Sequence, residues 1–202
     1  MTMEPAGPGT GPGAAPGTAP GTAPGRGTAP GRGTGPGAGP GRRTHITLLS
    51  GPNLNLLGER EPEVYGPARL EDHVRRAGAA AAAQGWTLDH RQTNHEGDLV
   101  EAVHAARERS AALVVNAGAL THTSWSLHDA LAAFEGVVIE VHLSNPAARE
   151  PFRHRSVVAP VADGLVAGMG GLGYELAVEA AIRLAAERGP REDLQDHSEE
   201  ER

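Results

Sequence analysis

Between residues 44 and 186, apolar residues follow two patterns that alternate along the chain. Short runs rich in Val, Ile and Leu, such as HITLLS at 45–50 and VVIEVHLS at 137–144, predict buried strands. Segments whose apolar positions lie three and four residues apart predict helices. The expected strands are 45–50, 86–92, 112–118, 137–144 and 164–169, and the expected helices are 69–84, 97–109, 122–134 and 174–187.

A strand followed by a helix and then by another strand indicates parallel strands joined by crossovers. Five strands in this pattern predict an α/β fold, namely a flavodoxin-like doubly wound sheet of order 2-1-3-4-5 with helices on both faces. Such sheets bind their ligands beyond the carboxyl ends of the strands. We therefore expect the functional residues to follow the strands directly.

Both ends of the chain differ in composition from this central segment. Residues 1–43 are built almost wholly from Gly, Pro, Ala and Thr, with little to bury, and are expected to be disordered. Residues 187–202 are polar and mostly acidic, and predict a loose tail. The catalytic domain is accordingly expected to span residues 44–186.

The overall composition excludes several kinds of chemistry. The chain has no cysteine and no lysine, so it has neither a thiolate nucleophile nor an amine that could form a Schiff base. A net charge of −7 argues against nucleic-acid binding through a broad basic face. No apolar run approaches the roughly 20 residues of a membrane helix, and no secretory signal is recognisable, so we expect a cytoplasmic protein that binds no membrane.

Polar residues gather where the expected strands end. GPNLN follows the first strand, TNHEG the second, NAG and THTS the third, and HLSN the fourth. The first cluster continues into LGEREPEVYG, which is longer than an ordinary strand-to-helix turn and is interpreted as a mobile flap carrying Arg60 and Tyr65. Taken alone, those two residues fit a surface ion pair and a packed aromatic ring equally well.

The fourth strand carries an acid–base pair. Glu140 and His142 are two residues apart and therefore lie on the same face of the strand. A carboxylate beside an imidazole can fix its tautomer and favour its protonated form, although the same pair could be purely structural. The REPFRHRS loop then supplies Arg149 and Arg153, whose guanidinium groups suit carboxylate and hydroxyl recognition.

Five motifs, in their order and spacing, resemble the motif set of the type II 3-dehydroquinate dehydratases. These motifs are GPNLNLLGEREPEVYG, QTNHEG, NAGALTHTS, IEVHLSN and REPFRHRS. The resemblance covers about residues 45–186. It implies a hydro-lyase of the shikimate pathway that dehydrates 3-dehydroquinate to 3-dehydroshikimate through an enolate, with neither metal nor organic cofactor.

The resemblance also implies a role for individual residues. Tyr65 would be the base, used as tyrosinate, with Arg60 supplying the positive charge that stabilises this form. Asn53 would hold the enolate oxygen through a water, and His142 would protonate the leaving hydroxyl while Glu140 orients it. The implied substrate-binding residues are Asn116, His122, Asp129, Leu143 through its backbone N–H, Ser144 and Arg153. Asp129 would reach a neighbouring subunit, which implies a homo-oligomer, typically a dodecamer of four trimers.

The sequence contains two further signals and leaves two rival functions open. GMGGLG at 168–173 matches a dinucleotide-binding pattern, but no strand follows to carry the ribose-binding acid, so it is interpreted as close packing at the start of the last helix. The ten histidines show no metal-ligand spacing, and His73, His90 and His104 are expected on the surface or on helix faces. The alternatives are a flavodoxin-like module that binds a small molecule or phosphate without turnover, and a non-catalytic assembly protein.

Overall fold

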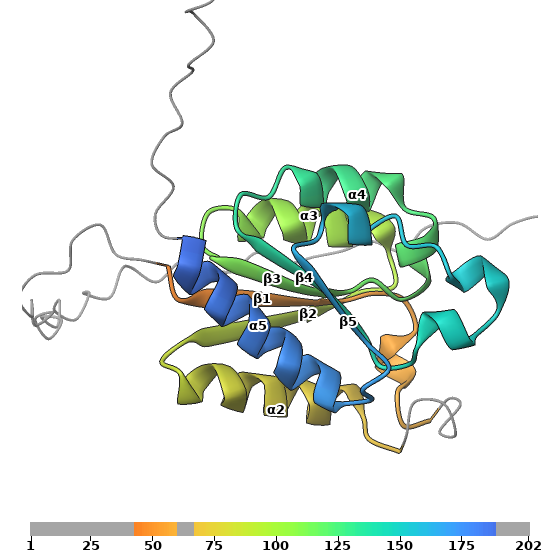
Figure 1. The fold of residues 1–202 in the computed structure, drawn as a ribbon, viewed down its shortest axis with the longest axis horizontal. Coiled ribbons are helices and arrows are strands. Elements are labelled where there is room, and N and C mark those ends of the chain that lie inside the picture. The colour runs from red at the N-terminus through yellow and green to blue at the C-terminus, as the bar shows by residue number, and fades with distance from the viewer. Residues whose placement is uncertain (1–42, 60–66, 189–202) are drawn as a thin grey trace, which may run out of the picture. The chain divides into compact units, whose positions relative to one another are not determined.

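The computed structural model describes residues 43–59 and 67–188, and within them the predicted sheet is confirmed (Figure 1). Five parallel strands have the order β2-β1-β3-β4-β5. Their bounds are β1 His45–Ser50, β2 Thr87–Gln92, β3 Ala112–Asn116, β4 Val137–His142 and β5 Gly164–Ala167. The expectations for residues 1–42, for 60–66 and for 189–202 lie outside the described residues.

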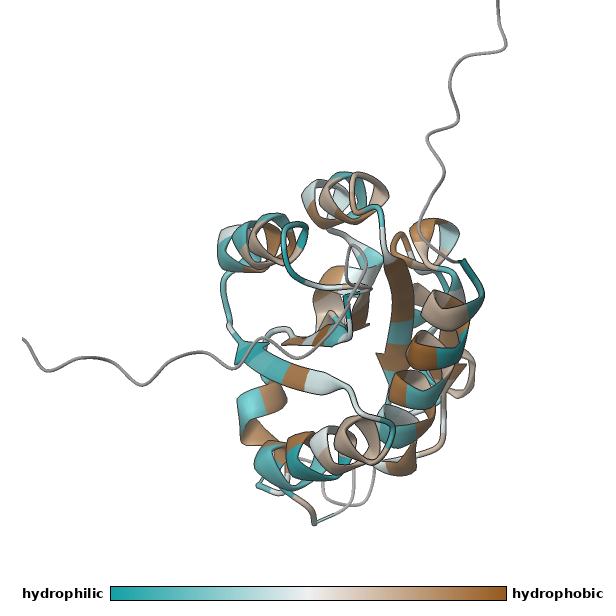
Figure 2. Cartoon of the chain, turned by 90° about the vertical axis from the view of Figure 1, so that its left-hand side faces the viewer, coloured by the Kyte–Doolittle hydropathy of each residue, from teal (hydrophilic) through white to brown (hydrophobic). Residues whose placement is uncertain are grey.

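Helices cover both faces of the sheet, as predicted (Figure 1). One face carries α2 (Leu70–Ala83) and α5 (Leu172–Arg188), and the other carries α3 (Glu96–Ala106) and α4 (Trp125–Ala132). Alternate strand residues feed two separate apolar cores, so that Ile139 packs with α2 and α5 while Val138 packs with α3 and α4. Figure 2 shows these apolar residues gathered in the central strands.

This alternation decides which face carries the acid–base pair. Ile139 and Val141 of β4 belong to the core beneath α2 and α5. Glu140 and His142 therefore point to the opposite face, toward the chain that leads into α4. At this face, buried polar residues replace the apolar core near the carboxyl end of the sheet.

Several element boundaries differ by a few residues from the sequence prediction, and two of these differences have an identifiable cause. The expected helix 122–134 begins only at Trp125, because the Ser124 hydroxyl caps α4 by accepting a hydrogen bond from the Leu127 N–H at 3.0 Å, and a short 3₁₀ helix, Gly118–His122, precedes it. The expected strand 164–169 ends at Ala167, because Gly168 adopts a left-handed φ of 79° that turns the chain.

His73 was expected on the surface or on a helix face, and it lies on the buried face of α2. This side chain is only 2% exposed and stacks on the ring of Tyr174, with 5.7 Å between the ring centroids. Helical periodicity indicates whether a residue is buried or exposed, but it does not indicate that an aromatic ring will contact that residue. Within the described ranges, no helix is long and apolar enough to cross a membrane.

Candidate active site

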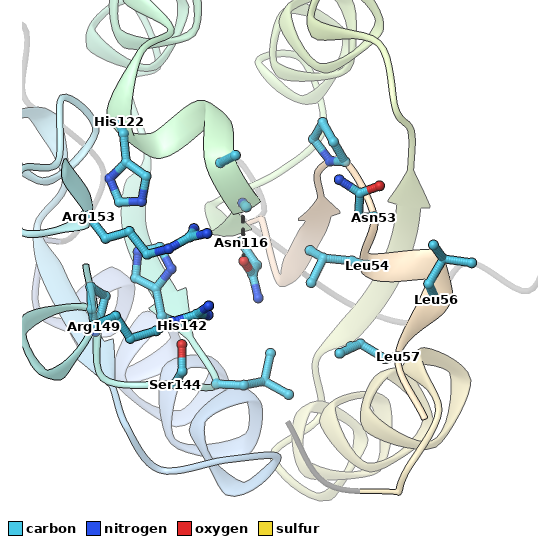
Figure 3. Close-up of a pocket in the computed structure, with 15 residues that line it drawn as sticks. Asn53, Leu54, Leu56, Leu57, Asn116, His122, His142, Ser144, Arg149 and Arg153 are labelled. Carbon is cyan, nitrogen blue, oxygen red and sulfur yellow. Dashed lines mark hydrogen bonds between the residues drawn. The ribbon is translucent and has the colours of Figure 1, made fainter. Parts of the chain in front are cut away.

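A cleft opens at the carboxyl ends of β1, β3 and β4, where the sequence placed the functional residues (Figure 3). The structure brings together most of the predicted site residues, although they come from four separate segments. The predicted residues that line the cleft are Asn53, Asn116, His122, His142, Leu143, Ser144 and Arg153, with Arg149 beside them.

At the floor of the cleft, His142 is bound to Glu140. The His142 Nε2 lies 2.9 Å from Oε1 of Glu140. Glu140 is completely buried, whereas His142 is 8% exposed and lines the cleft. Because a carboxylate can only accept, Nε2 carries the proton in this contact, and Nδ1 is the ring nitrogen that does not face Glu140. The pair therefore has the geometry of an oriented acid.

Two hydroxyl groups hold the Glu140 carboxylate in addition to His142. The Thr121 hydroxyl donates to Oε1 at 2.5 Å, and the Ser156 hydroxyl lies 2.9 Å from Oε1 and 3.0 Å from Oε2. Burial would raise the pKa of Glu140, but the hydrogen bonds from His142, Thr121 and Ser156 outweigh it and lower this pKa below its ordinary value. Glu140 is thus kept ionised in the protein interior.

Asn116, at the end of β3, is fixed from two sides. Its Nδ2 donates to the Tyr174 hydroxyl at 2.9 Å, and its Oδ1 accepts from the Gly118 N–H at 3.3 Å. Tyr174 is fully buried, and burial raises its pKa to about 12, against a smaller opposite effect of hydrogen bonds from Asn116 and Ser50. Tyr174 is therefore neutral at any physiological pH.

The Asn53 side of the cleft is held by a residue of the segment that follows β2. Asn53 has a left-handed φ of 66°, a conformation that asparagine adopts more readily than most residues. Its N–H donates to Oδ1 of Asn94 at 2.9 Å. The TNHEG cluster therefore contributes Asn94 as a support for the loop after β1.

The chain after His142 presents its backbone to the cleft because glycines hold the opposite side of its peptides. The Gly170 N–H donates to the Leu143 carbonyl at 2.9 Å, and the Gly168 N–H donates to the carbonyls of Ser144 at 3.1 Å and His142 at 3.3 Å. In a trans peptide the N–H points opposite to the carbonyl. The N–H groups of Leu143 and Ser144 accordingly point away from the glycine turn, which suits the predicted carboxylate cradle.

Cationic groups form the remaining wall of the cleft. The Arg153 side chain extends over His142 (Figure 3), and its Nε donates to Glu150 at 2.8 Å. Arg149 Nε lies 3.4 Å from the same carboxylate. The His122 Nδ1 donates to the Arg155 carbonyl at 2.8 Å, which leaves Nε2 for other contacts. These groups suit a small polyhydroxylated anion.

Four predicted residues do not line this described cleft, and one of them, Glu140, is buried directly behind it. Arg60 and Tyr65 lie outside the described residues. Asp129 is exposed on α4 and is not among the residues that line the cleft. Across residues 43–59 and 67–188, no cluster of three His, Asp or Glu side chains could hold a metal ion.

The sequence interpretation missed the residues that support the site from behind, namely Thr121, Ser156 and Tyr174. Thr121 and Ser156 lay within quoted motifs, but nothing in a single sequence says that their hydroxyls converge on Glu140. Tyr174 had one available signal, since a tyrosine in an apolar helix face must find a hydrogen-bond partner when it is buried.

Comparisons with known proteins point to one family. The family model described as dehydroquinase class II matches residues 44–182. The chain is 56% identical over 143 residues to a 3-dehydroquinate dehydratase of Hyphomonas neptunium, covering 70% of this chain and 95% of that protein. It is 52% identical over 143 residues to one of Cereibacter sphaeroides, covering 71% and 97%.

Solved structures give the same result. A type II dehydroquinase from Butyrivibrio crossotus superposes with a TM-score of 0.68 at 37% identity, covering 70% of this chain and 99% of that chain. A type II dehydroquinase from Propionibacterium acnes gives a TM-score of 0.66 at 39% identity, covering 71% and 97%.

Proposed function

The chain belongs to the dehydroquinase class II family, and on that premise we propose that its cleft dehydrates 3-dehydroquinate to 3-dehydroshikimate with the residues described above. The observation that carries this proposal is the oriented pair of His142 and buried Glu140 facing a cleft lined by anion-binding groups. The protein is a hydro-lyase of the shikimate pathway, and we place it in the cytoplasm.

The reaction needs a base and an acid on opposite sides of the substrate ring. The base removes a proton from the carbon next to the ketone, and the electron pair forms an enolate. The enolate then expels the hydroxyl of the following carbon, which leaves as water after it receives a proton. His142 supplies that proton, and Glu140 stabilises the protonated imidazole before the transfer.

Binding groups hold the substrate for these two steps. The N–H groups of Leu143 and Ser144, together with the Ser144 hydroxyl, hold the substrate carboxylate. His122 and Arg153 contact ring hydroxyls, and Asn116 binds the ring beside them. Asn53 holds a water against the enolate oxygen, where negative charge develops.

Tyr65 is the base in this proposal, with Arg60 stabilising the tyrosinate. The chain contains two tyrosines, and burial raises the pKa of Tyr174 to about 12 while Asn116 occupies its hydroxyl. Tyr174 is therefore unsuited to remove a substrate proton. Its exclusion supports the assignment of the base to Tyr65.

Ultraviolet absorbance tests the proposal directly, because the product is a conjugated enone acid and the substrate is not. The purified protein should increase the absorbance when mixed with 3-dehydroquinate. His142→Gln should lower kcat by about 100-fold or more, the usual contribution of a general acid. His104→Gln, on an exposed position of α3, is the matched control and should keep full activity. An unchanged absorbance with the wild-type protein would refute the proposed function.

We also propose that the protein assembles as a dodecamer of four trimers in which Asp129 completes the site of a neighbouring subunit. Its exposed position on α4, away from the cleft of its own chain, supports this proposal. Sedimentation should give the mass of the assembly. Asp129→Ala and Tyr65→Phe should each be inactive, and mixtures that exchange subunits should regain activity. Exchanged mixtures that remain inactive would mean that each subunit works alone.

A module that binds a flavin or phosphate without turnover is not favoured. Its usual mark is a Ser, Thr or Gly-rich phosphate loop after β1, but here Asn53 and the short 3₁₀ helix Leu54–Leu56 occupy this place. Binding without turnover also does not require an imidazole that is oriented by a buried carboxylate.

A further inference from the structure

Tyr174 reaches the active site from the interior of the protein. It lies on the buried side of α5, where its ring stacks on His73 and packs in the core beneath the sheet. Its hydroxyl nevertheless contacts a residue that lines the cleft, because Nδ2 of Asn116 lies 2.9 Å away. The side chain thus connects the core to one substrate-binding group.

The hydrogen bonds around Asn116 fix the orientation of its carboxamide. The Gly118 N–H can only donate, so the atom that faces it at 3.3 Å is the carbonyl oxygen Oδ1. The opposite end is then Nδ2, and one of its two protons goes to the Tyr174 hydroxyl. The second Nδ2 proton is left for an acceptor in the cleft.

We propose that Tyr174 is a positioning residue that holds the Asn116 carboxamide so that this second proton meets an oxygen of the bound substrate. This inference rests on the proposed function, in which Asn116 binds the substrate ring. Tyr174 touches no reacting atom and acts only through Asn116.

The Asn116 carboxamide needs this restraint because an asparagine side chain rotates easily about its last bond. Its terminal torsion has a broad, roughly two-fold preference, so the carboxamide rotates easily unless both ends are held. Without the Tyr174 hydroxyl, the Asn116 carboxamide would keep one hydrogen bond among the described residues, the 3.3 Å contact with the Gly118 N–H. The substrate would then have to order the carboxamide on binding, which weakens affinity more than it slows chemistry.

Tyr174→Phe is the direct test, because it removes the hydroxyl and keeps the ring that stacks on His73. We expect KM, and the Kd for 3-dehydroquinate by calorimetry, to rise about 3–10-fold, as for the loss of one hydrogen bond. We expect kcat to stay within about two-fold. Val178→Ala, one turn further along α5 and fully buried, is the control for general destabilisation and should leave KM unchanged.

A double-mutant cycle with Asn116→Ala separates positioning from a structural role. If Tyr174 acts through Asn116, adding Tyr174→Phe to Asn116→Ala should cause no further rise in KM. An equal rise in both backgrounds, or an unchanged KM in the single variant, would overturn the proposal.

The binding measurement keeps this inference separate from the proposed function. If the wild-type protein binds 3-dehydroquinate but does not dehydrate it, the proposed function fails, while the Kd values of the four proteins still test Tyr174. If Asn116→Ala leaves Kd unchanged, both the role of Asn116 and that of Tyr174 are wrong.

Discussion

Glu140→Gln separates the charge of this buried residue from its shape. Glutamine fills the same volume, but it replaces one carboxylate oxygen by an amide group that donates. The Ser156 hydroxyl already accepts from the N–H groups of Val158 and Ala159, so it must donate to residue 140. The glutamine oxygen is therefore expected to face Ser156, and its amide to face His142.

This arrangement reverses the hydrogen bond to the imidazole. The amide donates to Nε2 of His142, so that the proton of the neutral ring moves to Nδ1 and the charged ring loses its partner. The ring then carries its proton on Nδ1 but stays neutral, and a neutral imidazole is a far weaker acid than the protonated form that Glu140 stabilised. Since general acid catalysis contributes about 10²–10⁴-fold, we expect kcat to fall by at least about 100-fold. KM should change little, because Glu140 does not line the cleft.

The fold should survive this change. The hydrogen bond from Ser156 becomes a neutral one, and Thr121, which contacts the same oxygen as His142, must accept from the new amide in place of donating. These changes cost about 1 kcal/mol each, and removal of a buried charge offsets part of the loss. The measurements are kcat and KM from the product absorbance, together with urea unfolding. A folded Glu140→Gln protein with kcat within about three-fold of the wild type would refute the role of Glu140.

The remaining predictions concern the base, the glycine turn, the helix contact, the pH dependence and the N-terminal segment. Tyr65→Phe should abolish turnover while calorimetric affinity for substrate stays within a few-fold, and full activity would exclude Tyr65 as the base. Gly170 holds the Leu143 carbonyl and has a φ of 54°, a conformation that asparagine tolerates better than alanine. Gly170→Ala should therefore raise KM more than Gly170→Asn. Equal KM values would argue against the carboxylate cradle formed by the backbone of Leu143 and Ser144. Gly171→Ala should lower the free energy of unfolding by about 1–3 kcal/mol, since an added Cβ would lie 2.4 Å from the His73 ring, and an unchanged urea midpoint would contradict this. Folding lowers the pKa of Glu140, so this residue contributes fully to the free energy of unfolding above the ordinary glutamate pKa of 4.5. The contribution is lost as the pH falls through the lower pKa of the folded state. The free energy of unfolding of the Glu140→Gln protein should not show this decrease in acid. Deletion of residues 1–43 should leave activity and assembly intact, and a change in elution volume on size-exclusion chromatography would contradict that.

The strand order and the edge that carries the site could be predicted from the sequence, because both follow from local patterns. Runs such as 112–118 and 137–144 open with three or four consecutive apolar residues, as is typical of buried parallel strands, and polar clusters occur at their ends. The contact between Glu140 and His142 could be predicted as well, since two residues of one strand share a face by geometry alone.

The support of the site could not be predicted in the same way. Thr121 precedes Glu140 by 19 residues and Ser156 follows it by 16, and no periodicity connects them. Tyr174 and His73 meet through the packing of two helices that are distant in sequence. These contacts depend on tertiary packing, where a hydroxyl or a ring becomes important through its neighbours and not through its own segment.

The enclosure of Glu140 by Thr121 and Ser156 has a consequence for local unfolding. These donors belong to the two loops that border the cleft, so neither loop can open without leaving a buried carboxylate short of a partner. Cleft loops usually belong to the least stable part of a protein and exchange their amide hydrogens quickly. Here the amides of Val157 and Val158 should exchange together with those of the β4 strand, as one cooperative unit.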